Sequence, residues 1–146
     1  MIKIQKFTPN VQMSESLKNE ILQFLFASLE QYGDPKEDIN KAMEYACNKD
    51  KGGIIVIALS EEKVVGAVVV NETGMGGYIP ENILVYIATH PSQRGKGIGK
   101  QLMKETLESC KGDVALHVEP DNPAKKLYEN LGFTNKYLEM RYKKTV

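Results

Sequence analysis

The chain has 146 residues, 42% of them hydrophobic and 26% charged, with 19 basic residues balancing 19 acidic ones. This composition is typical of one globular domain and excludes an extended disordered chain. Zero net charge gives no general attraction to nucleic acid or membranes, and no apolar run approaches the roughly 18 residues of a membrane span. With no secretory pattern at the N-terminus, we expect a single soluble, cytoplasmic domain over residues 1–146, in which Cys47 and Cys110 are reduced thiols.

The first half of the sequence predicts one strand, two helices and a hairpin. Alternating apolar residues predict a strand near the N-terminus, and apolar residues at helical spacing predict a helix from Ser14 to about Gln31. Asp34 followed by Pro35 is typical of a helix start, with Asp34 as the N-cap of a helix that runs to about Asn48. Two runs rich in β-branched residues, separated by a compact turn, predict an antiparallel hairpin over 54–59 and 64–70.

The second half predicts a sheet that alternates with helices. After a glycine-rich loop, the expected elements are a strand over 83–89, a helix over 98–110, a strand over 114–118, a helix over 122–131 and two short strands, from Phe133 onward and over 138–142. Strands that flank a crossover helix pair in parallel, whereas hairpins pair antiparallel. The predicted fold is therefore a mixed α/β sheet of about seven strands with about four helices.

The segment HPSQRGKGIGKQL, residues 90–102, joins the strand over 83–89 to the following helix. It carries three glycines at alternate positions, interleaved with cations: Gly95, Gly97 and Gly99, with Arg94, Lys96 and Lys100. A glycine-rich turn that opens a helix presents free backbone N–H groups and the positive end of the helix dipole to one point. The pattern therefore predicts an anion site, most simply for phosphate.

Two familiar phosphate-binding motifs do not fit this turn. The dinucleotide fingerprint requires G-x-G-x-x-G, whereas the spacing here is G-x-G-x-G. The Walker A motif requires a hydroxyl residue after its lysine, and Gln101 follows Lys100. The missing hydroxyl also disfavours an ATP-binding protein.

Two segments resemble signatures of the GCN5-related N-acetyltransferase (GNAT) family. Gln93–Gly99 is similar to Q/R-x-x-G-x-G/A, which in that family binds the pyrophosphate of acetyl-CoA, and Asn122–Phe133 resembles N-x-x-A-x-x-L-Y-x-x-x-G-F. The resemblance covers roughly residues 82–134. It implies a single-domain GNAT-like sheet splayed between the fourth and fifth strands, acetyl-CoA as co-substrate and a primary amine as acceptor.

The resemblance also implies which residues contact acetyl-CoA. In the family, the pantetheine arm pairs with the splayed strand, and a main-chain N–H, here near Ile87, polarises the thioester carbonyl. Asn122 matches a family contact to that arm and is equally suited to cap a helix. The implied coenzyme-binding set is Ile87, Ala88, Thr89, Gln93, Arg94, Gly95, Lys96, Gly97, Ile98, Gly99, Lys100, Asn122 and Tyr128.

The resemblance implies two catalytic residues and no metal. Tyr128 matches the tyrosine that protonates the leaving thiolate; the alternative is that it packs beside its leucine neighbours. Glu81, thirteen residues before Arg94, matches a general base of the histone-acetylating branch; the alternative is a solvated surface carboxylate. His90 and His117 are further titratable residues, for which structural roles are favoured.

The acceptor is the least determined part of the prediction. In the family it is bounded by segments that correspond to residues 26–39 and 72–80, which carry acidic and apolar side chains: Asp34, Glu37, Asp38 and Glu72, with Met75 and Tyr78. A small-molecule amine ranks first, and a peptide N-terminus or lysine follows. The alternative class is a non-catalytic acyl-CoA sensor or interaction module. A homodimer, paired through the C-terminal strand, remains open.

Overall fold

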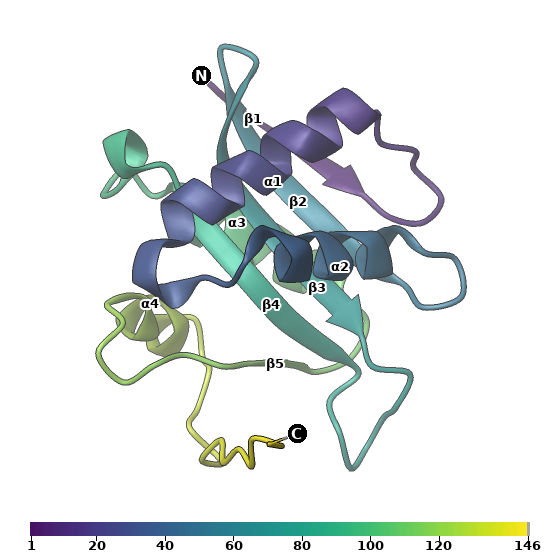
Figure 1. The fold of residues 1–146 in the computed structure, drawn as a ribbon. Coiled ribbons are helices and arrows are strands. Elements are labelled where there is room, and N and C mark those ends of the chain that lie inside the picture. The colour runs from purple at the N-terminus through teal and green to yellow at the C-terminus, as the bar shows by residue number, and fades with distance from the viewer. Residues whose placement is uncertain (146) are drawn as a thin grey trace. The chain divides into compact units, whose positions relative to one another are not determined.

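The computed structural model describes residues 1–145, which form two compact units, Met1–Leu116 and the segment that begins at His117. The first unit contains one five-stranded sheet, three α-helices and two short 3-10 helices (Figure 1). Its elements are β1 (Ile2–Phe7), α1 (Glu15–Leu29), η1 (Glu30–Tyr32), α2 (Lys36–Cys47), β2 (Gly53–Ser60), β3 (Lys63–Glu72), β4 (Asn82–Thr89), η2 (Pro91–Gln93), α3 (Ile98–Ser109) and β5 (Val114–Leu116).

The sheet is mixed and open, in the strand order β1-β2-β3-β4-β5. Neighbouring strands from β1 to β4 pair antiparallel, and β4 pairs with β5 in parallel, as the crossover through α3 predicts. The β4–β5 pairing is short, since it ends at Leu84 opposite Leu116, whereas β4 continues to Thr89. The second half of β4 is therefore paired with β3 but not with β5.

Helices cover both faces of the sheet: α1 and α2 lie on one face and α3 on the other (Figure 1). On the first face, Ile21 and Met43 are buried in one cluster with Ile55 and Val69 of the sheet. On the second face, a Cβ added at Gly66 would lie 2.7 Å from Leu102 of α3, so glycine permits close packing there. Burial on both faces explains why β2 and β3 are continuous apolar runs.

The start of α2 differs from the prediction. Ser14 caps α1, because its hydroxyl accepts the Leu17 N–H at 3.1 Å. Asp34, however, does not cap α2, whose first helical residue is Lys36 and whose N-cap is Pro35 without a side-chain cap. The physical reason is that the Asp34 carboxylate accepts a hydrogen bond from Tyr86 of β4 instead.

The second unit contains α4 (Ala124–Asn130) and irregular backbone. The prediction of about seven strands was wrong, because the described residues contain five, and none lies in 133–145. The large apolar side chains of the predicted last strand are exposed: Leu138, Met140 and Tyr142. Apolar alternation makes a strand only where a neighbouring strand accepts its hydrogen bonds. No helix among the described residues is long and apolar enough to cross a membrane.

Candidate functional site: the glycine turn and the end of β4

The turn before α3 presents free backbone donors. Gly95 and Gly97 have φ angles of 79° and 81°, a region that favours glycine, and a Cβ added at either would meet nothing within 4 Å. The first helical hydrogen bond of α3 runs from the Gln101 N–H to the Gly97 carbonyl at 3.0 Å. The N–H groups of residues 97–100 therefore precede the helical ladder and have no acceptor within it.

These donors fit a pyrophosphate. The open space over Gly95 and Gly97 lets a phosphate oxygen approach the main chain, and the positive end of α3 favours an anion there. Lys96 and Lys100 are exposed beside the turn, and within residues 1–145 no carboxylate lies within 4.0 Å of either ammonium group. Ile98 is buried and anchors the helix beneath the turn.

Arg94 is the exception among the predicted phosphate-binding cations, because it is already bound within the chain. Its Nη2 donates to the Ser28 carbonyl at 3.2 Å and to Glu30 Oε1 at 3.3 Å. Arg94 thus connects the glycine turn to the end of α1. Local sequence patterns do not indicate this contact, because its partners lie more than sixty positions earlier in the chain.

The second half of β4 supplies the other predicted coenzyme contacts. Ile87, Ala88 and Thr89 are paired with Val68, Ala67 and Gly66 of β3. Since pairing with β5 ends at Leu84, the edge of β4 that faces β5 is open along these residues. The register also shifts near Val85, which has no partner in β3. This edge can pair with an extended ligand in the way that an added strand would.

Tyr86, which immediately precedes Ile87, is hydrogen bonded to the connection between α1 and α2. Its hydroxyl donates to Asp34 Oδ2 at 2.5 Å. Burial, followed by the hydrogen bond to Asp34 and the charges of Asp34 and Asp38, raises the pKa of Tyr86 above its usual range. The phenol therefore stays protonated and keeps its donor role at physiological pH. The sequence offered no reason to single out Tyr86.

Glu81 lies before the start of β4, away from the predicted thioester contact. Its Oε1 accepts the Asp113 N–H at 2.9 Å, and this hydrogen bond lowers the pKa of the exposed carboxyl. A strand rises about 3.3 Å per residue, so Glu81 lies about 20 Å along the chain from Ile87. The contacts favour a carboxylate that holds the turn before β5, while the predicted role as a base stays untested.

Of the two histidines, His90 has the structural setting that the sequence favoured, whereas His117 lies just after the end of β5. His90 Nδ1 accepts the Ser92 N–H at 3.1 Å and lies 2.8 Å from the Ser92 hydroxyl, so the ring caps η2. His117 is exposed.

Within the second unit, Tyr128 is buried and the Asn122 side chain is hydrogen bonded to the start of α4. Tyr128 is 6% exposed, and its ring centroid lies 6.0 Å from that of Phe133. Burial raises the pKa of Tyr128 to about 12. Asn122 Oδ1 accepts the N–H of Ala124, the first residue of α4, at 2.9 Å, although the N-cap position is Pro123; its predicted coenzyme contact stays a prediction.

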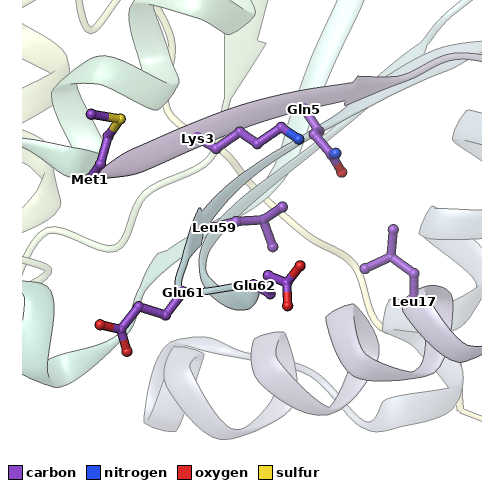
Figure 2. Close-up of a pocket in the computed structure, with 7 residues that line it drawn as sticks. All are labelled: Met1, Lys3, Gln5, Leu17, Leu59, Glu61 and Glu62. Atoms are coloured by element: carbon purple, nitrogen blue, oxygen red, sulfur yellow. The ribbon is translucent and has the colours of Figure 1, made fainter.

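A separate hollow lies at the β1 edge of the sheet (Figure 2). Side chains from the N-terminal residue, β1, α1 and the β2–β3 hairpin line it: Met1, Lys3, Gln5, Leu17, Leu59, Glu61 and Glu62. It shares no residue with the predicted coenzyme site.

Comparison with known families identifies the chain. The acetyltransferase (GNAT) domain family matches residues 51–135, and the chain belongs to this family. A mycothiol acetyltransferase of Brachybacterium faecium is 37% identical over 84 residues, which are 54% of this chain and 25% of that protein. N-alpha-acetyltransferase RimI of Mycobacterium tuberculosis is 40% identical over 58 residues, 38% of this chain and 37% of that one. The chain thus spans well under half the length of either relative.

A solved structure supports the same fold. Aminoglycoside N-acetyltransferase AAC(6')-Iy in complex with CoA superposes with a TM-score of 0.73 at 18% identity, over 100% of this chain and 96% of that one. The predicted GNAT family is confirmed, and so is acetyl-CoA as the co-substrate that this family implies. The site residues and the acceptor are matters of proposal.

Proposed function

We propose that this protein is an acetyl-CoA-dependent N-acetyltransferase that acts on a primary amine. The observation that carries the proposal is the open glycine turn, with free N–H groups at residues 97–100, placed directly after a strand whose second half has an open edge. A pyrophosphate and an extended pantetheine arm need these two features side by side. Family membership supports the same conclusion.

Bound acetyl-CoA supplies a thioester, whose carbonyl carbon is attacked by the amine and whose sulfur leaves as a thiolate. The glycine turn and the exposed Lys96 and Lys100 hold the phosphates. The open edge of β4 aligns the arm, and a main-chain N–H near Ile87 stabilises the negative charge that develops on the carbonyl oxygen. These contacts are backbone interactions, so they need the geometry of β4 more than its side chains.

Proton transfer is assigned to Tyr128 as general acid. With a pKa of about 12, the phenol is fully protonated at neutral pH and can donate a proton to the leaving sulfur. Glu81 stays the candidate for general base from the sequence. Its bond to the Asp113 N–H and its lowered pKa make it a weak one, so deprotonation by water is the competing route.

We rank a small cationic amine first as acceptor. The acidic residues at the start of α2, Glu37 and Asp38, are exposed, and Asp34 before them is exposed too. The AAC(6')-Iy neighbour acts on aminoglycosides by its name, and the mycothiol relative also takes a small molecule. The RimI relative supports a protein N-terminus as the second candidate.

A thiol-release assay tests the function. Acetyl-CoA is offered with a library of small amines, peptides with free N-termini and lysine peptides, and free CoA is measured. We expect amine-dependent release that is largest with a small polycation. Tight acetyl-CoA binding without release from any amine would instead identify the non-catalytic sensor. Size-exclusion chromatography with light scattering and cell fractionation test the predicted homodimer and cytoplasmic location.

The Tyr128→Phe variant tests the general acid. We expect kcat to fall about a hundredfold, the lower range for removing a general acid, while the acetyl-CoA Kd stays nearly unchanged. Tyr137→Phe is the matched control, because Tyr137 belongs to the same unit and is 78% exposed. Unchanged turnover in Tyr128→Phe would remove Tyr128 from the mechanism.

A further inference from the structure

The connection between α1 and α2 is held from two places, both next to the proposed coenzyme site. At its beginning, Arg94 Nη2 donates to the Ser28 carbonyl and to Glu30 Oε1, at 3.2 and 3.3 Å. At its end, the Tyr86 hydroxyl donates to Asp34 Oδ2 at 2.5 Å. We call residues 28–34 the acceptor wall, because they belong to the segment 26–39 that the proposed function assigns to the amine.

Both holding residues belong to the segments that grip acetyl-CoA in the proposed function. Arg94 opens the glycine turn, and Tyr86 directly precedes Ile87 on β4. All of these residues lie in the unit Met1–Leu116. The acceptor wall is therefore connected to the phosphate side through Arg94 and to the thioester side through Tyr86.

Arg94 can hold a phosphate and the acceptor wall together. A guanidinium group has five N–H donors in a rigid plane, and the two on Nη2 are used by Ser28 and Glu30. Three donors, on Nε and Nη1, are left for an anion at the glycine turn, and the side chain of Arg94 is half exposed. A phosphate bound to these donors would immobilise the guanidinium group of Arg94. The Arg94 side chain then loses less rotamer freedom when it holds the acceptor wall in place.

The wall also contains a strained residue. Glu30 has φ 54° and ψ −129°, a conformation that non-glycine residues rarely adopt. Such a conformation persists only where surrounding contacts impose it, and the hydrogen bond from Arg94 is one of these contacts. The shape of the wall therefore depends on Arg94.

We propose that Arg94 and Tyr86 are positioning residues that hold residues 28–34 in the shape that receives the amine, and that phosphate binding at Arg94 strengthens this hold. Acetyl-CoA and the amine then bind with positive coupling, and by linkage each raises the affinity for the other by the same factor. The inference rests on the proposed N-acetyltransferase function. In this inference, the contacts Arg94–Glu30 and Tyr86–Asp34 raise the affinity for the amine and leave the rate of the chemical step unchanged.

Steady-state kinetics of Glu30→Gln and Tyr86→Phe test the positioning role. Each is expected to raise the amine KM about tenfold while kcat changes less than about threefold, a loss of binding without a loss of chemistry. Glu139→Gln is the matched control, since its exposed partner Arg141 lies at 3.4 Å, close to the Arg94–Glu30 distance. It should leave KM unchanged.

Glu30→Gly separates positioning from folding. Glycine accepts a φ of 54° without strain, so this variant should be at least as heat-stable as the wild type. It lacks the carboxylate that binds Arg94, so its amine KM should still rise. A rise in KM without loss of stability cannot be attributed to misfolding.

Calorimetry measures the coupling directly. CoA is titrated into the wild-type protein with and without saturating amine, and the amine should tighten CoA binding at least about fivefold, the lower end of typical couplings. In Glu30→Gln, the ratio of the CoA Kd without amine to the CoA Kd with amine should approach one. Normal turnover with an unchanged amine KM in Glu30→Gln and Tyr86→Phe, and a wild-type ratio in Glu30→Gln, would overturn the inference alone. A wild type that releases no thiol with any amine would overturn the proposed function and the inference with it.

Discussion

The two ends of β4 have the same strand geometry but differ in how many of their hydrogen-bonding groups have a partner. At the start, the buried Asn82 donates through its amide to the Lys111 carbonyl at 2.8 Å and the Asp113 carbonyl at 3.2 Å. Pairing there runs to both β3 and β5. Beyond Leu84, pairing with β5 has stopped, and the strand leads through η2 into a turn whose N–H groups have no helical acceptor.

This difference indicates where a ligand can bind. Backbone groups that are already paired have nothing to offer a ligand, whereas open groups must find a partner. Glu81 belongs to the saturated start, where its carboxylate completes the hydrogen bonds of the turn before β5. Ile87 belongs to the open end. The spacing of a motif therefore indicates which residue is a candidate for the site. The hydrogen bonds that this residue already makes indicate whether it is available to a ligand.

Asn82→Ala should show the largest effect, on stability. The variant removes the two part-buried hydrogen bonds from the Asn82 amide to the Lys111 and Asp113 carbonyls, at a cost of about 2 kcal/mol, roughly thirtyfold in the folding equilibrium. Urea unfolding measures it as a lower midpoint, and Asn40→Ala, whose amide donates to Glu44 on the surface, should change the midpoint little. Acetyl-CoA affinity of the folded protein should stay unchanged. If Asn82→Ala lost acetyl-CoA affinity but kept normal stability, the start of β4 would also belong to the ligand site, which would contradict the proposed difference between the two ends.

Gly97→Val tests the open end. A β-branched side chain at a φ of 81° strains the turn and fills the space over its N–H groups, so the acetyl-CoA Kd should rise at least about tenfold. Gly77→Val is the matched control: its φ is 78° and it is equally open, but it lies in the loop before β4. Calorimetric titration should find its Kd unchanged. Equal losses in both variants would indicate general strain and would argue against a phosphate site at Gly97.

Glu81→Gln should have the smallest effect on turnover. If the carboxylate only holds the turn before β5, kcat should fall less than about twofold and the pH–rate profile should keep its basic and acidic limbs, since no general base is removed. A lost acidic limb would restore Glu81 as the base.

The same variant makes a prediction about acid stability. The pKa of Glu81 is lowered in the folded protein, so its stabilising contribution is present at neutral pH and disappears as the pH falls through that lowered pKa. Urea midpoints of wild type and Glu81→Gln should differ at pH 7 and converge in acid, at a pH below the ordinary glutamate pKa. If the urea midpoints still differed in acid, the charge of the Glu81 carboxylate would not account for its stabilising contribution.

Local features were predictable, and contacts between distant segments were not. Helices α1 and α3, strands β2 to β4 and the glycine turn follow from periodicity and glycine spacing, which act over a few residues. Asp34 looked like a helix cap because its neighbours fit that role, yet its carboxylate binds Tyr86, 52 positions away. Residues 138–142 were predicted to form a strand, but among the described residues they pair with no other strand.

By itself, the sequence determined that a helix begins after a glycine turn rich in cations, and it hence predicted an anion site there; backbone conformation and the helix dipole suffice for that prediction. Tertiary structure decided what each charged or hydroxyl group is free to do. In the folded chain, Arg94 is hydrogen bonded to Glu30, Tyr86 to Asp34, and the Glu81 carboxylate to the Asp113 N–H. A hydrogen bond requires its partners to lie about 3 Å apart, and only the folded chain brings residues so distant in sequence to that separation.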